Sequence, residues 1–84
     1  MTEVDLNKIK AHHIVDARGS ACPGPLLEAK KGISKVPKGG VLEVQSSDPG
    51  TKNDLPAWCR RAGHKFLGVL EADGYDRVFI QRLK

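Results

Sequence analysis

The run Cys22-Pro23-Gly24-Pro25 constrains the fold of this chain more than any other feature of its sequence. A residue that precedes proline is pushed out of the α conformation, so Cys22 must be extended and cannot lie within a helix. Proline itself is favoured at the first position of a helix. We therefore expect a strand to end before this run and a helix to begin at Pro23 or Pro25, with Cys22 within about one turn of the helix start.

Apolar residues on both sides of this run predict a strand and a helix. The segment from His13 to Ala17 has the composition of a strand and is stopped by Arg18-Gly19-Ser20. After the run, apolar residues recur at helical spacing, and Pro37 with Gly39-Gly40 predicts the end of that helix. The residues at this spacing are Leu26, Ala29, Ile33 and Val36.

The middle of the chain predicts a second strand and a second helix. Val41 to Val44 shows little alternation, which is typical of a central strand with both faces at least partly covered. A turn at residues 47–50 leads to a helix predicted from Asn53 to Ala62. Thr51 or Asp54 is expected to cap this helix at its N-terminus, Gly63 to end it, and Pro56 to lie in its first turn.

The C-terminal part predicts a β-hairpin. Two extended runs, Lys65 to Ala72 and Tyr75 to Leu83, flank Asp73-Gly74, which is a strong hairpin dipeptide. In the second run Val78 and Ile80 alternate with Phe79 and Gln81, so one face is expected to be apolar and the other mixed.

This order of elements defines the fold class. A chain of 84 residues is long enough for one domain. We expect an α/β (α+β) protein, a two-layer βαβαββ sandwich with two helices on one face of a four-stranded mixed sheet. Residues 1–11 are expected to form a poorly ordered lead-in, and residues 12–84 the single domain.

Composition excludes several classes of protein. No apolar run approaches the ~18–20 residues that a transmembrane helix needs. The two cysteines, Cys22 and Cys59, cannot form the disulfide framework of a small secreted protein, so a reducing cytoplasm is the expected location. Metal ligands at close spacing are missing from the sequence, so no metal site is expected. The net charge of +4 permits an anionic partner without naming one.

The two cysteines have different expected roles. A free thiol with a pKa near 8.5 is only about 3% ionised at pH 7, but a helix N-terminus and nearby positive charge lower that pKa. Arg18 would add to this effect at Cys22, and Glu28 would oppose it. We expect an exposed, reactive Cys22 on a stretch stiffened by Pro23 and Pro25. The alternative, a Cys22 that is merely a small buried side chain, stays open, whereas Cys59 is expected to pack in the core beside Trp58.

Basic residues near the end of the second helix suggest a second kind of site. Arg60, Arg61 and Lys65 are candidates for a docking surface that binds acidic partner proteins. Ordinary exposed charge on a helix is an equally good interpretation of these residues.

The motifs, taken together, resemble one family. Asp16-x-Arg18-Gly19-x-x-Cys22-Pro23-x-Pro25 is followed by several shorter motifs, and the whole pattern resembles the TusA/SirA-like sulfur-carrier family over residues 13–83. Ser20-Ala21 and Gly32 depart from the common family pattern without touching Cys22. The shorter motifs are Gly40-x-Leu42-x-Val44, Asp48-Pro49, Asp54-Leu55, Trp58-Cys59 and Gly63-His64.

The resemblance implies a function. Members accept a sulfane sulfur as a persulfide on the cysteine that corresponds to Cys22 and relay it to partner proteins, in tRNA 2-thiouridine synthesis or in dissimilatory sulfur oxidation. Pro23 and Pro25 would hold the site rigid, with Arg18 and Gly24 in supporting roles. Rhodanese, cysteine desulfurase or DsrE-type proteins would be the donors and acceptors. The chemistry is of the sulfurtransferase type and needs no cofactor, because the sulfur is carried covalently on Cys22.

Two other classes of function remain as alternatives. One is an RNA- or protein-binding regulatory module that does not use Cys22, although no aromatic-basic stretch typical of RNA recognition is present. The other is a small thiol redox switch, which lacks the C-x-x-C motif. RNA, DNA and membranes are not expected as direct partners.

Overall fold

The computed structural model of the protein describes residues 11–19 and 24–84. These residues form six elements in the order that the sequence predicts. Most of the expected lead-in at residues 1–11 lies outside the described residues, as do Cys22 and Pro23, so the division into a lead-in and a domain of residues 12–84 stays a prediction. The elements are β1 (His13–Asp16), α1 (Gly24–Ile33), β2 (Val41–Ser46), α2 (Thr51–Ala62), β3 (Lys65–Ala72) and β4 (Tyr75–Gln81).

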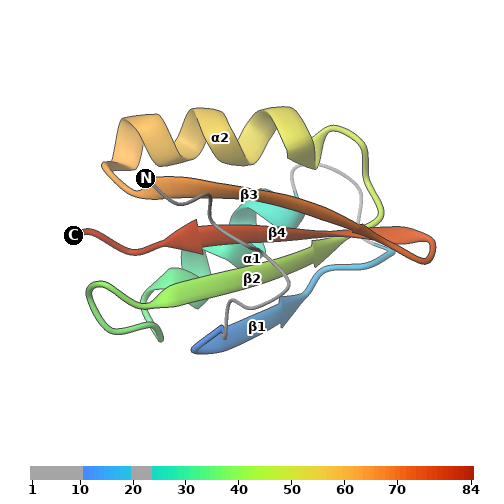
Figure 1. Ribbon diagram of the computed structural model, residues 1–84. Coiled ribbons are helices and arrows are strands. Elements are labelled where there is room, and N and C mark those ends of the chain that lie inside the picture. Colours follow the sequence, from blue (N-terminus) through green and yellow to red (C-terminus); the bar gives the residue numbers. More distant parts are fainter. Residues whose placement is uncertain (1–10, 20–23) are drawn as a thin grey trace, which may run out of the picture.

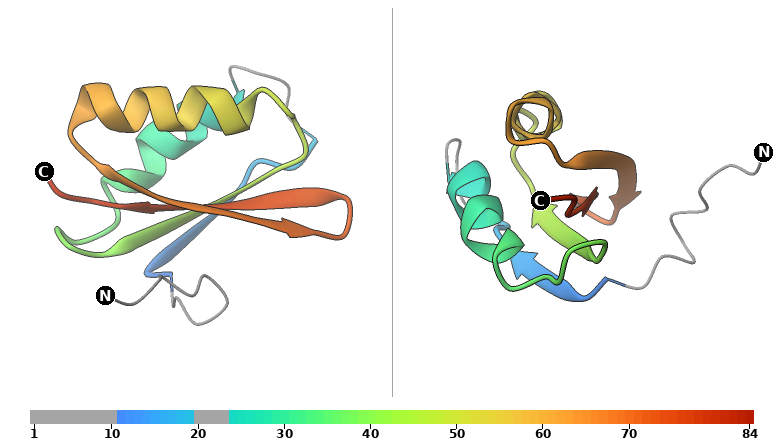
Figure 2. Two further views of the ribbon diagram at one scale, coloured as in Figure 1. Left: turned by 45° about the horizontal axis from the view of Figure 1, so that its top comes forward. Right: turned by 90° about the vertical axis from the view of Figure 1, so that its left-hand side faces the viewer.

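Within the described part of the chain, the strands form one mixed sheet with the order β1-β2-β4-β3. β1 pairs with β2 in parallel, whereas β4 is antiparallel to both β2 and β3. Figures 1 and 2 show that α1 and α2 lie on the same face of this sheet. The predicted two-layer α/β sandwich is therefore confirmed.

The core lies between the sheet and the helices, and β2 runs through its middle. Leu42 and Val44 of β2 are paired with Ile80 and Val78 of β4, and all four are fully buried. The expectation that β2 is a central strand with both faces at least partly covered is confirmed. Helix α1 contributes Ala29 and Ile33 to the same core, and α2 contributes Leu55, Trp58 and Cys59.

Gly32 lets α1 approach the sheet closely. A Cβ atom at this position would lie 2.5 Å from Cγ2 of Val15 and 3.1 Å from Cδ1 of Leu42. The glycine that interrupts the helical pattern therefore has a packing reason, which compensates for its low helix propensity. The predicted extent of this helix was too long, because α1 ends at Ile33 and Val36 is buried in the turn that follows.

Helix α2 begins earlier than predicted. Gly50 occupies the N-cap position and makes no side-chain cap hydrogen bond, so the prediction of a cap at Thr51 or Asp54 and of a helix start at Asn53 is wrong. The hydroxyl of Thr51 is instead within hydrogen-bond distance of the Ser46 hydroxyl, at 2.7 Å in a buried position. The earlier start places Pro56 inside the helix rather than in its first turn. The predicted end is confirmed, since Gly63 adopts the left-handed conformation and its N–H bonds to the carbonyl of Cys59.

The C-terminal hairpin forms as predicted, with Ala72 paired to Tyr75 across Asp73-Gly74. Gly74 has a φ of 82°, which glycine adopts without a steric penalty. β4 ends at Gln81, two residues before the predicted end. Phe79 lies on the face that was expected to be mixed, yet it is fully buried.

An ion pair explains part of this burial on the sheet face opposite the helices. Glu43 of β2, only 3% exposed, accepts hydrogen bonds from Nε and Nη2 of Arg77, both at 3.1 Å, and from Nε2 of Gln45 at 2.8 Å. The guanidinium of Arg77 also lies over the ring of Phe79. Burial alone would raise the pKa of Glu43, but the hydrogen bonds from Arg77 and Gln45 and the charge of Arg77 hold it below its ordinary value.

We expect Arg77→Met to destabilise the protein by about 3 kcal/mol at pH 7, because it leaves the buried Glu43 carboxylate unpaired. In the wild type the folded-state pKa of Glu43 is lowered, so its contribution is present above the unfolded pKa and is lost as the pH falls through the folded pKa. In Arg77→Met, burial raises that pKa instead, so the variant should lose its deficit as the pH falls toward 4.

Urea unfolding of the wild type and of Arg77→Met between pH 4 and pH 8 measures both effects. The double variant Glu43→Gln/Arg77→Met is the control, because it removes the buried charge and should be more stable than Arg77→Met at pH 7. A deficit that does not depend on pH would contradict the assignment.

Candidate functional site

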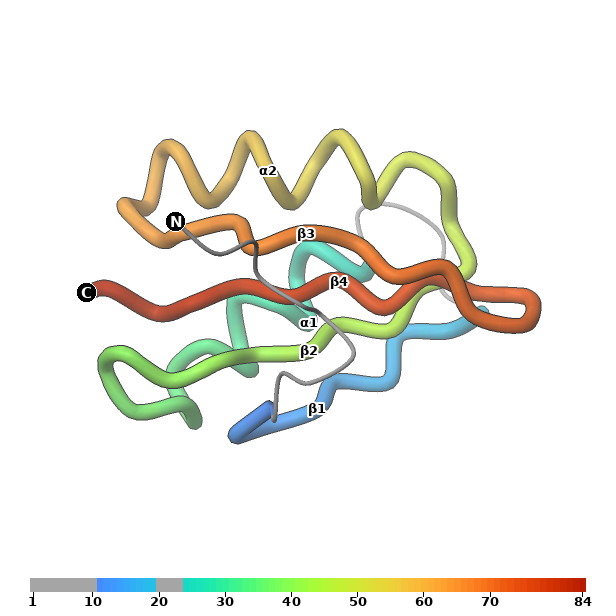
Figure 3. Tube along the Cα trace, in the orientation of Figure 1, coloured from blue at the N-terminus to red at the C-terminus, as the bar shows by residue number. Residues whose placement is uncertain are grey.

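The parallel pairing of β1 with β2 indicates which end of the molecule carries the candidate site. Each of these strands is followed by a helix, so the carboxyl ends of both strands and the starts of α1 and α2 lie at the same end, as the tube in Figure 3 shows. The turn of the β3–β4 hairpin lies at this end too. Sheets of this kind bind their ligands outside the carboxyl ends of parallel strands.

Helix α1 begins at Gly24, between the two prolines that were predicted to begin it. Cys22 precedes Gly24 by two residues, so chain connectivity limits the distance between their Cα atoms to about 7 Å. Pro25 is fully buried, which fixes the first turn of α1 against the rest of the protein. The first turn of α1 contains no carboxylate, and the last turn contains Lys30 and Lys31, a charge pattern that leaves the positive end of the helix dipole uncompensated by acidic side chains.

Arg18, the predicted supporting residue before Cys22, is held by an ion pair. Its Nε lies 2.9 Å from Oδ1 of Asp16 and its Nη2 lies 3.0 Å from Oδ2. The side-chain and backbone hydrogen bonds of Arg18 lower the pKa of Asp16 to about 2. Because Asp16 already balances its charge, Arg18 has less positive charge to offer Cys22 than an unpaired guanidinium would have.

Two contacts from distant parts of the chain hold the same region. The guanidinium carbon of Arg18 lies 4.9 Å from the centre of the Tyr75 ring at the start of β4. The hydroxyl of Ser47, just after β2, accepts a hydrogen bond of 2.9 Å from the N–H of Gly19. Sequence reasoning missed both residues, because neither is close to Cys22 along the chain.

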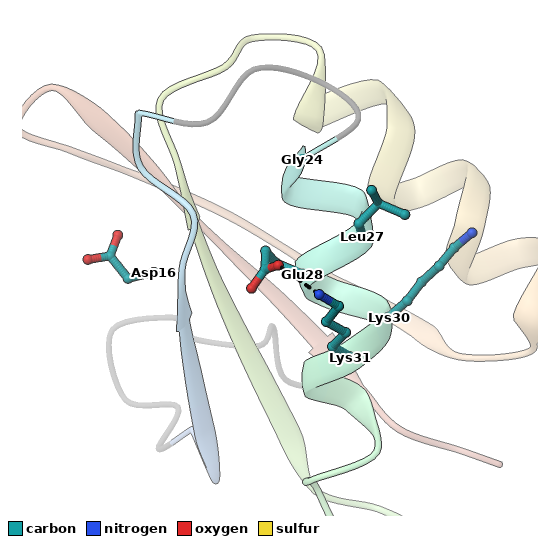
Figure 4. Close-up of a pocket in the computed structure, with 6 residues that line it drawn as sticks. All are labelled: Asp16, Gly24, Leu27, Glu28, Lys30 and Lys31. Carbon is teal, nitrogen blue, oxygen red and sulfur yellow. Dashed lines mark ion pairs between the residues drawn. The ribbon is translucent and has the colours of Figure 1, made fainter.

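A pocket of about 430 Å³ lies beside the start of α1. Figure 4 shows that the side chains of Glu28 and Lys31 point toward each other, as an ion pair of 3.6 Å, whereas the carboxylate of Asp16 points away from the helix. Leu27 is half exposed, so this pocket presents an apolar side chain to solvent. The residues that line the pocket are Asp16, Gly24, Leu27, Glu28, Lys30 and Lys31.

Cys59 lies in the core, as predicted. Its side chain is 1% exposed and belongs to the same cluster as Leu55 and Trp58. Burial raises the pKa of its thiol to about 11, although the charge of Arg60 acts in the opposite direction. A thiol with this pKa is almost entirely protonated at neutral pH and is therefore a poor nucleophile.

The predicted docking residues lie away from the start of α1. Arg60 and Arg61 are in the last turn of α2, and Lys65 begins β3. Helix α2 has 12 residues and so is about 18 Å long. Its last turn lies at the end of the sheet opposite the β3–β4 turn (Figure 1). The structure therefore does not bring these three residues together with Gly24, and their docking role stays a prediction.

Over residues 11–19 and 24–84, no group of three or more His, Cys, Asp or Glu side chains could hold a metal ion. In the same described part of the chain, no helix is long and apolar enough to cross a membrane.

A cysteine that is followed at once by Pro-Gly-Pro and precedes a helix start by two residues, on a βαβαββ sandwich, is the arrangement expected of a small protein that works through one thiol. Comparison with known proteins shows which family within this class the chain matches. The family profile of sulfurtransferase TusA matches residues 13–82. The chain therefore belongs to the TusA family, and the resemblance to TusA/SirA-like sulfur carriers is confirmed.

Individual relatives agree with this assignment. A presumptive sulfur carrier protein of Archaeoglobus fulgidus is 45% identical over 84% of this chain and 97% of its own length. The sulfur carrier protein TusA of Pseudomonas entomophila is 40% identical over 81% of this chain and 85% of its own. The crystal structure of a SirA-like protein from Desulfitobacterium hafniense has a TM-score of 0.73 at 27% identity, and the match covers 86% of this chain and 99% of that one.

We expect the two cysteines to differ sharply toward iodoacetamide. In the native protein at pH 7.5, the label should appear on Cys22 alone, because the raised pKa and burial of Cys59 remove its thiolate. Cys59 should react only after denaturation. Peptide mass spectrometry before and after adding guanidinium chloride locates the labels. Equal native labelling of both cysteines would show that the core around Cys59 opens readily.

Proposed function

We propose that this protein is a sulfur carrier that accepts a sulfane sulfur as a persulfide on Cys22 and relays it to partner proteins. The observation that carries the proposal is the start of α1 at Gly24, two residues after Cys22, with no carboxylate in its first turn. Membership of the TusA family, whose relatives are named as sulfur carriers, supports the same chemistry.

The transfer is an exchange at sulfur that needs one nucleophile from this chain. The Cys22 thiolate attacks the outer sulfur of a donor persulfide, a new S–S bond forms to Cys22, and the donor leaves as a thiolate with the electron pair of the broken S–S bond. In the second half, an acceptor thiolate attacks the outer sulfur on Cys22, and Cys22 leaves as its thiolate. No external oxidant or reductant is consumed.

The start of α1 supplies the electrostatics for this exchange. Backbone N–H groups of the first turn and the positive end of the helix dipole favour an anion nearby. Both the Cys22 thiolate and its persulfide anion would gain from this field. The nearest carboxylate of the helix, Glu28, is paired with Lys31, which reduces its repulsion of an anionic sulfur.

The same site needs no cofactor and no acid or base of its own, because the partners can supply these groups. The surface beside the start of α1 suits a protein partner: Leu27 offers an exposed apolar side chain, and Lys30 and Lys31 offer positive charge on the same helix. We therefore propose that donors and acceptors dock at these three residues, with Arg60, Arg61 and Lys65 as the alternative surface. Cysteine desulfurases, rhodaneses and DsrE-type proteins are the candidate partners, and tRNA 2-thiouridine synthesis or dissimilatory sulfur oxidation the candidate pathways.

Sulfur loading tests the function directly. After incubation with a sulfane-sulfur donor such as polysulfide, the wild type should gain about 32 Da for one sulfur atom, located on Cys22. Cys22→Ser should gain nothing, since it lacks the nucleophile, whereas Cys59→Ala should load like the wild type. Intact and peptide mass spectrometry read the result. Loading that persists in Cys22→Ser would overturn the proposal.

Docking is tested by charge and polarity changes in a transfer assay with a persulfidated cysteine desulfurase. We expect Leu27→Asp/Lys30→Glu to slow transfer to Cys22 about tenfold or more, because central apolar and charged contacts dominate such interfaces. Arg60→Glu/Arg61→Glu is the matched pair at the far end of α2 and should leave the rate unchanged. The reverse ranking of the two variants would move the docking surface to the end of α2.

A further inference from the structure

The connection between β1 and α1, residues 17–23, is anchored on its N-terminal side by contacts that reach across the fold. The N–H of Ala17 bonds to the carbonyl of Gln45 at 2.8 Å, which extends the parallel pairing one residue beyond β1. Ala17 itself is 1% exposed. The chain therefore leaves the sheet at a defined point, five residues before Cys22.

The Arg18 side chain, which follows Ala17, contacts both the carboxylate of Asp16 and the ring of Tyr75. The Asp16 carboxylate accepts hydrogen bonds from Nε and Nη2 of the Arg18 guanidinium. The backbone N–H of Arg18 also donates to Oδ1 of this carboxylate, at 3.1 Å. The carbon atom of the guanidinium lies over the Tyr75 ring. A carboxylate fork and an aromatic ring together restrict a guanidinium in a way that a lysine ammonium could not reproduce.

Gly19 completes the anchor three residues before Cys22. Its φ of 82° is in the left-handed region, where the chain reverses its direction, and a Cβ there would have nothing within 4 Å. The glycine is thus required by the backbone conformation and not by crowding. Its N–H is bonded to Ser47, which belongs to the loop between β2 and α2.

We propose that Ser47 and Tyr75 are positioning residues for Cys22, which act through Gly19 and Arg18 to direct the chain so that the thiol is held at the start of α1. This inference rests on the proposed function, because it assigns a task to these contacts only if Cys22 is the working group. On the far side of Cys22, the buried Pro25 holds the other end of the connection. The short stretch between Gly19 and Gly24 is thereby fixed at both ends.

Suitable variants distinguish an effect of the position of the Cys22 thiol from an effect of nearby charges. The charged groups of the described residues at this end of the molecule include Asp16, Arg18, Glu28, Lys30, Lys31, Asp48, Lys52, Asp54, Glu71, Asp73 and Asp76. Neither Ser47→Ala nor Tyr75→Ala removes any of them. A change in Cys22 reactivity in these two variants therefore arises from the position of the thiol and not from a lost charge. Arg18→Lys is the complementary variant, because it keeps the positive charge but loses the two hydrogen bonds of the guanidinium to Asp16 and its contact with the Tyr75 ring.

The test is the pH profile of Cys22 alkylation by iodoacetamide, measured on the full chain with urea unfolding in parallel. We expect Ser47→Ala, Tyr75→Ala and Arg18→Lys to move the midpoint toward the ordinary thiol value and to lower the rate at pH 7 by roughly three- to tenfold. Tyr75→Phe keeps the ring, and Ser34→Ala removes a hydroxyl in the turn after α1 that donates to the carbonyl of Lys31, so both should follow the wild type.

A purely structural role would lower the midpoint of urea unfolding and leave the alkylation profile unchanged, and that result would overturn the proposal. The proposed function fails separately, if the wild type takes up no sulfur on Cys22. The alkylation profiles remain informative in that case, because they need no sulfur donor.

Discussion

The parallel pairing of β1 with β2 is the constraint on which the rest of this structure depends. Two parallel strands cannot be joined by a tight turn, so the chain must cross over the sheet, and it does so through α1. The crossover places the carboxyl end of β1, the start of α1 and the residues after β2 at one end. Ser47 can therefore reach Gly19, and the segment that carries Cys22 begins and ends at this same place.

The crossover also has to pack. Helix α1 lies close to β1 and β2 because Gly32 has no Cβ to meet Val15 and Leu42. The opposite face of the sheet is organised differently, through the ion pair of Glu43 with Arg77 rather than through a helix. Each face thus has its own means of excluding water, and the two meet in β2, whose residues alternate between them.

The features that sequence could predict are those decided by a few neighbouring residues. Local signals such as Asp73-Gly74 and Gly63 each act within a single turn, and the proline run acts on its immediate neighbours. The element order and the two-layer fold could therefore be predicted from the sequence. Errors arose where tertiary contacts competed with local preference. Val36 continues the helical spacing but is buried in a turn, and Thr51 has the chemistry of a cap but pairs with Ser46 as the helix begins around it. Ser47 and Tyr75 escaped prediction because their partners lie about 28 and 57 residues earlier in the chain.

The two cysteines occupy different places along the chain relative to the helices. Cys59 faces the core from α2, and burial makes its thiolate unfavourable. Cys22 precedes the first residue of α1 by two positions, and a residue that is followed by proline is disfavoured in the α conformation. A carrier has to protect its sulfur from wasteful exchange with its own second thiol while leaving it open to partners. Burying Cys59 on α2 meets the first requirement, because a buried thiol with a raised pKa has almost no thiolate to attack a sulfur atom. In the proposed function the second requirement falls on Cys22, and the crossover sets where the chain that carries it enters α1.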